Sequence, residues 1–199
     1  MNSIGQTPVF FVIGPAGSGK SSFARALAVR IHGAYLDKDA ICNTYTGVLL
    51  EGHGYDPSER DGNAYYRDEL MPIEYESLLN VGSCNAKLGI PVIFDAPFGA
   101  FFNDANYVKN IASKHNWPQQ IHAVVIHISV DGKKVHQRLI ERGLKRDSWK
   151  LDHWDSFWPK ASGVTCTWQQ ATHITINNDT DREDFTNDVN AVIKTITNS

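Results

Sequence analysis

The feature that most constrains the fold of this chain is a glycine-rich stretch near its N-terminus. It matches the pattern G-x-x-x-x-G-K-[ST] at every fixed position, and it reads Gly14-Pro15-Ala16-Gly17-Ser18-Gly19-Lys20-Ser21. Glycines in such a stretch let consecutive backbone N–H groups point at phosphate oxygens, and the N-terminus of a following helix adds unpaired donors. This is the P-loop pattern, so we expect these residues and the adjoining Ser22 to bind the phosphates of a nucleotide.

Two side chains of the stretch carry specific chemistry. Lys20 places a positive charge at the β- and γ-phosphates, and Ser21 offers a hard hydroxyl oxygen to Mg²⁺. The flanks fit as well, because residues 9–13 form an unbroken apolar run, which is typical of a parallel strand buried on both faces. Apolar residues then recur at helical spacing from 23 to 31. A glycine-rich turn without a nucleotide is therefore the weaker alternative.

Composition favours a single domain covering residues 1–199. With 42% hydrophobic residues the chain can form a full core, and its net charge of −3 does not favour nucleic acid or an anionic membrane as a partner. The three cysteines form no metal or redox pattern, and no apolar run reaches the length of a membrane helix. We expect a protein of the cytoplasm.

Carboxylates follow two further apolar segments that we interpret as strands. A short apolar segment leads into Asp37-Lys38-Asp39, and a longer one leads into Asp95. In open α/β sheets the ligand lies outside the carboxyl ends of the strands, so these side chains should face the same crevice as the P-loop. The alternative for Asp37 or Asp39 is a cap on the helix that follows.

The region between these two carboxylate-bearing strands, residues 43–89, should lie over the substrate. Glycine and polar residues are frequent in 43–62, which we expect to form a mobile loop, and helices should follow up to about residue 89. Arg60 and Arg67 are candidates for substrate contacts, although surface ion pairs with neighbouring carboxylates are the favoured interpretation for both. No motif in this region names the substrate.

A basic stretch, residues 133–150, contains seven lysines and arginines against two acidic residues, so its charge of +5 leaves −8 for the rest of the chain. Arg138 and Arg142 lie one helical turn apart on the same face, and Arg146 follows a glycine that should end the helix. Such runs are usually solvated faces, and the acidic residues of the stretch could pair with it. Because the P-loop already implies a nucleotide, we expect a lid whose arginines bind phosphate, with Arg138 assigned to the nucleotide.

Four of the five tryptophans fall between residues 149 and 168. They could stack on a base or an aromatic substrate, but packing of a loop-rich segment onto the sheet is the favoured interpretation. A last strand at 173–176 and an amphipathic helix from 185 to 196 complete the pattern.

The order of these features resembles that of small P-loop kinases over nearly the whole chain. The pattern is most similar to AAA-like ATP-binding proteins of unassigned substrate, with zeta toxin, chloramphenicol phosphotransferase, polynucleotide kinase, shikimate kinase and gluconate kinase as wider relatives. The resemblance implies an α/β fold, a P-loop NTPase three-layer α/β/α sandwich around a five-stranded parallel sheet of order 2-3-1-4-5.

The resemblance also implies roles for individual residues. Asp39 matches the carboxylate that accepts the proton of the substrate hydroxyl, so it is the expected catalytic base. Asp37 and Asp95 resemble ligands of Mg²⁺ or contacts to the substrate. Arg142 and Arg146 match the lid arginines that reach the phosphoryl group during transfer.

Together these features predict an ATP-dependent kinase that transfers the γ-phosphoryl group to a hydroxyl of a small molecule. A kinase for a nucleoside, a nucleotide or a nucleic-acid 5′-hydroxyl is one alternative, and a nucleotide-dependent switch or NTPase with water as its acceptor is another. Asp95 is followed by Ala96 and Pro97 rather than by an acidic residue that would orient a water molecule. This favours transfer over hydrolysis.

Overall fold

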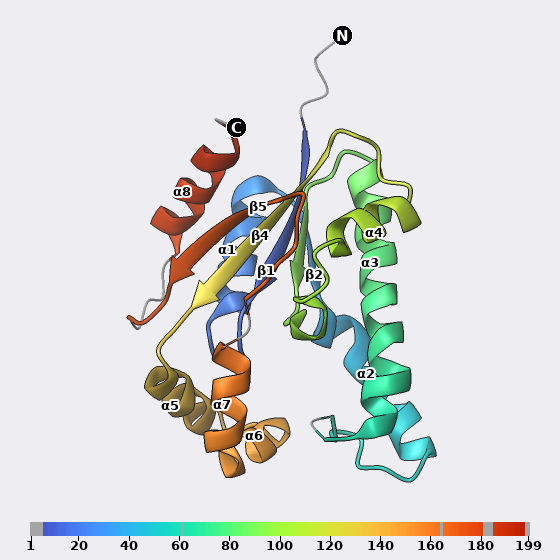
Figure 1. The fold of residues 1–199 in the computed structure, drawn as a ribbon, viewed down its shortest axis with the longest axis vertical. Helices are drawn as coiled ribbons and strands as arrows, with labels where there is room; N and C mark the ends of the chain where they lie inside the picture. Colours follow the sequence, from blue (N-terminus) through green and yellow to red (C-terminus); the bar gives the residue numbers. More distant parts are fainter. Residues whose placement is uncertain (1–5, 61, 164, 181–184, 198–199) are drawn as a thin grey trace.

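The computed structural model describes residues 6–60, 62–163, 165–180 and 185–197. Within these ranges the chain forms one five-stranded sheet of order β2-β3-β1-β4-β5, in which all neighbouring strands run parallel (Figure 1). The predicted strand order is therefore confirmed. The strands are β1 (Thr7–Ile13), β2 (Ala34–Asp37), β3 (Val92–Asp95), β4 (Ile121–Ser129) and β5 (Ala171–Asn177).

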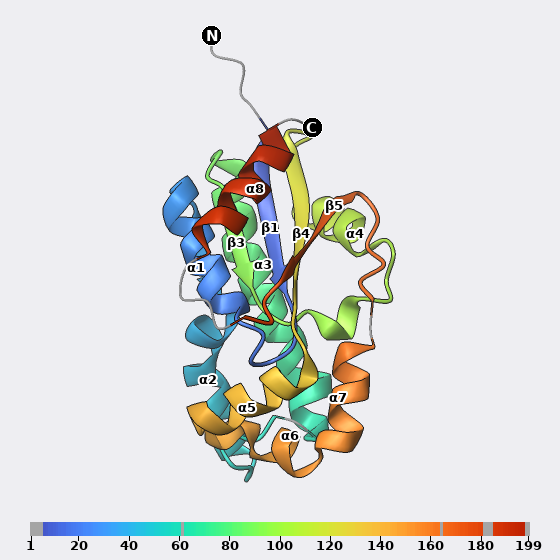
Figure 2. The same cartoon turned by 90° about the vertical axis from the view of Figure 1, so that its left-hand side faces the viewer.

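Helices cover both faces of the sheet and give the predicted three layers (Figure 2). Alternate residues of β1 point to opposite faces, as the period of a strand requires. Phe10 packs in a cluster with apolar residues of α1 (Lys20–Ile31) and α8 (Thr186–Thr197). Phe11 packs on the other face with residues of α3 (Met71–Lys87) and α4 (Tyr107–Lys114). The central strand is thus buried on both sides, which explains its unbroken apolar sequence.

The remaining helices gather beyond the carboxyl ends of the strands, at the lower end of the molecule in Figure 1. On one side α2 (Lys38–Gly52) lies beside α3, which is preceded by a π-helical turn, η1 (Tyr66–Leu70). On the other side are α5 (Gly132–Arg142), the 3₁₀ turn η3 (Lys145–Asp147), α6 (Ser148–Asp152) and α7 (Trp154–Ser162). A further 3₁₀ turn, η2 (Gly99–Phe101), follows β3. No helix in the described ranges combines the length and the apolar character needed to cross a membrane.

The prediction of a mobile loop over 43–62 is wrong for its first half, because α2 continues to Gly52. Cys42, Thr46 and Leu50 recur every fourth residue and are all fully buried. This spacing forms one buried helical face, which outweighs the low helix propensity of the glycines.

The tryptophan-rich segment is also more regular than predicted, since α6 and α7 occupy much of it. Trp168 is only 2% exposed and packs against Phe11, Phe98 and Tyr107, so the packing interpretation is confirmed for this residue. Trp154 and Trp158 stack on each other with ring centroids 5.3 Å apart, and they pack on α5 rather than on the sheet.

Candidate active site

The P-loop joins β1 to α1, so the strand and helix that the motif requires on its flanks are both present. Gly17 and Gly19 have φ angles of 79° and 89°, in the left-handed region that favours glycine. A Cβ atom at Gly19 would lie within 2.4 Å of the side-chain nitrogen of Asn178. Gly19 therefore has two functions, because it permits the turn into α1 and leaves room for the side chain of Asn178, which is distant along the chain.

Two residues from distant segments brace the P-loop backbone. Asn178 directly follows the end of β5, and its side-chain amide donates to the carbonyl oxygen of Ser18 at 2.7 Å. Arg138 donates to the carbonyl oxygens of Gly17 at 3.4 Å and Asn178 at 3.1 Å. Arg138 thus contacts the outside of the P-loop, and its predicted contact with the nucleotide itself stays a prediction. No pattern in the sequence points to Asn178.

The carboxylates at the ends of β2 and β3 lie side by side. Asp37 is the register partner of Asp95, and the Tyr35 hydroxyl lies 3.2 Å from Asp37 Oδ2 and 2.8 Å from Asp95 Oδ2. Burial raises the pKa of Tyr35 well above its usual value, and the hydrogen bond to Asp95 adds to the shift, so the phenol remains a donor. Asp95 is 3% exposed, and its Oδ1 has no hydrogen-bond partner among the described residues. This oxygen is therefore open to a metal ion, a water molecule or a donor group of a substrate.

The two aspartates at the junction of β2 and α2 have different environments. Asp37 is the N-cap of α2, where its Oδ1 accepts from the backbone N–H groups of Asp39 at 2.9 Å and Ala40 at 3.2 Å. The helix-cap alternative is therefore correct for Asp37. Asp39 lies in the first turn of α2, and its carboxylate lies 3.7 Å from the ammonium group of Lys38. It also lines the cavity described next.

One cavity of about 390 Å³ lies between the P-loop, the strand ends and the helices beyond them. It brings together eight of the residues predicted from the sequence, namely Ala16, Lys20, Ser21, Asp37, Asp39, Arg60, Asp95 and Arg142. Arg138 is outside its lining. The side chain of Arg146 is outside the described part of the structure.

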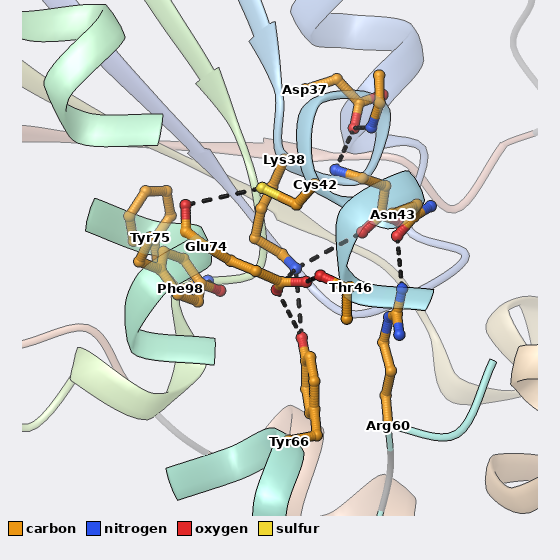
Figure 3. A network of polar contacts seen from close by, with 12 residues as sticks. Asp37, Lys38, Cys42, Asn43, Thr46, Arg60, Tyr66, Glu74, Tyr75 and Phe98 are labelled. Carbon is orange, nitrogen blue, oxygen red and sulfur yellow. Dashed lines mark hydrogen bonds and ion pairs between the residues drawn. The ribbon is translucent and has the colours of Figure 1, made fainter. Parts of the chain in front are cut away.

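A buried polar network that the sequence analysis missed forms the side of this cavity toward α2 and α3 (Figure 3). Lys38 is 5% exposed and Glu74 is fully buried, and the Lys38 ammonium lies 2.5 Å from Glu74 Oε2. The same oxygen accepts from the Tyr66 hydroxyl at 2.8 Å, while Oε1 accepts from the Thr46 hydroxyl at 2.6 Å. Burial raises the pKa of Tyr66, and the Glu74 carboxylate raises it further, so Tyr66 stays a donor. These contacts join α2, η1 and α3.

Within the basic segment 133–150, an arginine forms an ion pair with a carboxylate of the same segment. Arg142 donates from Nε and Nη2 to the two oxygens of Asp147 at 2.6 and 2.8 Å, and Asp147 is 1% exposed. Lys145 pairs with Asp56 at 2.7 Å, which connects the segment to the turn after α2. Hydrogen bonds from Lys145 and Ser58 hold the pKa of Asp56 below its usual range. As the sequence predicts, Gly143 ends α5 with a φ of 57°.

The family model of the AAA domain matches residues 9–157 of the chain. Among curated proteins, a tRNA dimethylallyltransferase of Pseudarthrobacter chlorophenolicus is 32% identical over 74 residues. This match covers 37% of the present chain and 24% of that enzyme, so the chain spans about a quarter of the relative's length.

Solved structures with the same fold cover nearly the whole chain. A provisionally named kinase from Chloroflexus aurantiacus superimposes with a TM-score of 0.67 at 15% identity, covering 97% of this chain and 98% of that one. The APS kinase of Mycobacterium tuberculosis gives 0.55 at 18% identity, covering 96% and 98%. A gluconokinase of Sinorhizobium meliloti gives 0.55 at 13% identity, covering 97% and 94%. At these identities the similarity establishes the fold, which is that of small P-loop kinases.

Proposed function

Because the chain belongs to the AAA domain family, we propose that it is an ATP-dependent kinase that transfers the γ-phosphoryl group to a hydroxyl of a small molecule. One observation carries the proposal. A single cavity contains Lys20 and Ser21 of the P-loop together with Asp39, a carboxylate whose neighbour Asp37 performs the capping of α2. The phosphate site thus shares its cavity with Asp39, whose carboxylate is not the N-cap of α2 and can act as the base.

The donor set of the cavity fits Mg²⁺ as the accompanying metal. The Ser21 hydroxyl and the carboxylates of Asp37 and Asp95 are hard oxygen ligands that line the same cavity, and Asp95 Oδ1 has no donor among the described residues. These residues would hold the ion directly or through its waters. When bound, Mg²⁺ supplies positive charge that neutralises the phosphate oxygens.

The chain's own groups have defined tasks in the transfer. The P-loop amides and Lys20 hold the phosphates in place, and the acceptor hydroxyl lies between the γ-phosphorus and Asp39. As the new P–O bond forms and the bond to the β-phosphate oxygen breaks, the hydroxyl proton passes to Asp39 and ADP leaves. Because the transition state is loose, the proton is lost late, and an aspartate of ordinary basicity is sufficient.

We propose that the segment 133–150 acts as a lid in this reaction. Arg142 lines the cavity yet pairs with Asp147, so it can exchange this partner for the phosphoryl group. The ion pair between Lys145 and Asp56 supports the proposal that this segment closes over the cavity, because the pair joins η3 to the turn after α2. The role predicted for Arg146 remains part of this proposal.

The three free cysteines support the cytoplasm, a reducing compartment, as the place of action. Activity is tested by incubating the protein with γ-labelled ATP and three classes of acceptor: small-molecule alcohols and hydroxy acids, nucleosides, and oligonucleotides with a free 5′-hydroxyl. We expect transfer to the first class. Transfer to the second or third class would support the alternative kinase, and release of labelled phosphate alone would indicate an NTPase.

A further inference from the structure

Arg60 differs from the other cationic side chains of the cavity. It lies in the turn between α2 and η1, and its Nη2 donates to the side-chain oxygen of Asn43 at 2.9 Å. Its guanidinium carbon is 5.3 Å from the centre of the Tyr66 ring (Figure 3). The neutral amide and the aromatic face orient the guanidinium without neutralising its charge.

The remaining amino group of Arg60 lacks a partner. Its Nη1 is buried and makes no hydrogen bond to any residue that the structure describes. Within the same ranges no carboxylate lies at ion-pair distance from Arg60, although the cavity cations Lys38 and Arg142 are paired with Glu74 and Asp147. A buried, charged donor without an acceptor is costly, so this position is suited to an anionic oxygen from outside the chain.

Arg67 provides the contrast on the same part of the fold. It makes two hydrogen bonds to Asp68, at 2.7 and 2.8 Å, and its side chain is 62% exposed. The ion-pair interpretation from the sequence is therefore confirmed for Arg67. For Arg60 the structure gives a neutral partner instead, which returns it to the candidate substrate contacts.

Part of the cavity lining is apolar. It consists of small and aliphatic groups from the segment after β3 and from the start of α3, namely Met71, Ala96, Pro97, Gly99 and Ala100. On the α2 side, the polar groups of Lys38 and Tyr66 are both engaged with Glu74. The apolar groups thus line the same cavity as the charged groups of the P-loop and the strand ends, and they can contact the body of an acceptor whose charge binds elsewhere.

We propose that the phosphoryl acceptor is a hydroxyl-bearing anion with an apolar body, whose carboxylate or phosphate group binds Arg60. The inference rests on the proposed kinase function and names its substrate class. The anionic group accepts a hydrogen bond from Arg60 Nη1, the apolar body contacts Met71 and Pro97, and the hydroxyl reaches Asp39. Arg60 thus selects anionic acceptors over neutral ones.

A fractionated extract tests the charge of the acceptor. A small-molecule cell extract is separated by anion exchange, and the neutral flow-through and the retained fraction are each incubated with the protein and γ-labelled ATP. We expect label transfer to compounds of the retained fraction. Loss of transfer after phosphatase treatment of that fraction, followed by removal of the phosphatase, identifies a phosphate as the anion; loss after methyl esterification identifies a carboxylate.

The two possible failures are distinct. Transfer confined to the neutral flow-through would overturn the anionic acceptor and leave the kinase function intact. Transfer to neither fraction by protein that binds ATP would contradict the kinase function, and the acceptor proposal would be rejected with it.

Variants then assign the selection to Arg60. Arg60→Met should raise KM for the identified acceptor by roughly tenfold to a hundredfold, the range expected for one hydrogen bond to a charged group. KM for the uncharged derivative of that acceptor should hardly change, and Arg60→Lys should restore part of the preference for the anion. Arg67→Met is the matched control and should leave both KM values unchanged. Equal effects of Arg60→Met on charged and uncharged acceptors would show a purely structural role and overturn the proposal.

Discussion

The phosphate side of the cavity comes from eight consecutive residues, whereas the side toward α2 and α3, called here the α2–α3 wall, takes Lys38, Arg60 and Tyr66 from three separate segments. The buried carboxylate of Glu74 holds two of these side chains in place. The P-loop works through its backbone and needs glycine where the φ angle is positive. The α2–α3 wall works through side chains that reach each other only after the helices have packed. The first kind of site leaves a fixed spacing in the sequence, and the second kind leaves none.

The two walls should also respond differently to mutation. Substitutions of the phosphate-binding side chains remove contacts that form only when the nucleotide is bound. They should therefore reduce activity without reducing the stability of the free protein. Substitutions in the α2–α3 wall disturb contacts that exist in the free protein, so they should reduce stability as well. The following predictions test this difference, starting from the largest effect.

Lys20→Ala should have the largest effect on activity. The change removes a charge from the β- and γ-phosphates in the ground state and in the transition state. We expect kcat/KM to fall by about 10⁴, with weaker ATP binding as part of the loss. The urea midpoint of unfolding should stay the same. Lys109→Ala, on the exposed side of α4, is the control and should leave both quantities unchanged. Normal turnover of Lys20→Ala would contradict the phosphate site.

Asp39→Asn separates the base from the nucleotide site. Asparagine keeps the size of the side chain but accepts no proton, so turnover should fall by about 10³ while ATP affinity changes little. Stability should be retained, because Asp37 caps α2. Asp37→Asn serves as the comparison for stability alone, since asparagine is also a good N-cap, whereas its turnover should fall because Asp37 is a proposed Mg²⁺ ligand. A fall in stability with full turnover would mean that Asp39 holds the helix and is not the base.

Much of the fold could be predicted because its signals are local. The apolar runs of β1 and β3 and the P-loop spacing lie within a few consecutive residues, and the parallel strands then bring Asp37 and Asp95 to one edge. The C-terminal end of α5 was predicted at Gly143, whose φ of 57° suits glycine. In each case the physical cause and the sequence signal are in the same short stretch.

The remaining features depend on contacts between distant residues. Asn178 reaches the carbonyl oxygen of Ser18, which is 160 positions away. Arg60 is distinguished by the absence of a carboxylate partner among the described residues. The sequence points the other way, because acidic residues next to Arg60 favour an ion pair. Glu74 did leave a signal, because it shares the buried face of α3 with Leu78. A charged residue on an apolar helix face indicates a buried partner, but it does not say which one.

Glu74→Gln tests the α2–α3 wall as a structural element. Glutamine still accepts from Thr46 or Tyr66, but it removes the nearer counter-ion of the buried Lys38 ammonium and leaves only the longer contact of 3.7 Å to Asp39. We therefore expect a loss of about 3 kcal/mol in the free energy of unfolding, measured with urea. Glu76→Gln is the matched control on the same helix, where the partly exposed pair with Lys114, at 2.7 Å, should be worth less than about 1 kcal/mol.

Equal losses in the two glutamate variants would show that the buried network contributes no more than a surface pair. The comparison between the two walls would then have to be given up. ATP affinity, measured on both variants under conditions where they are folded, should remain unchanged, because neither glutamate lines the cavity.

Arg142→Ala should have the smallest effect, and it tests whether the lid belongs with the phosphate wall. In the proposed mechanism Arg142 stabilises the transition state only after it leaves Asp147, and the loss of that ion pair offsets part of the stabilisation. Turnover should therefore fall by only about tenfold, the value of one modest charged hydrogen bond, and ATP affinity should fall less. A non-hydrolysable ATP analogue with Mg²⁺ should also protect segment 133–150 from trypsin. Full turnover of Arg142→Ala without such protection would make the segment an ordinary solvated face.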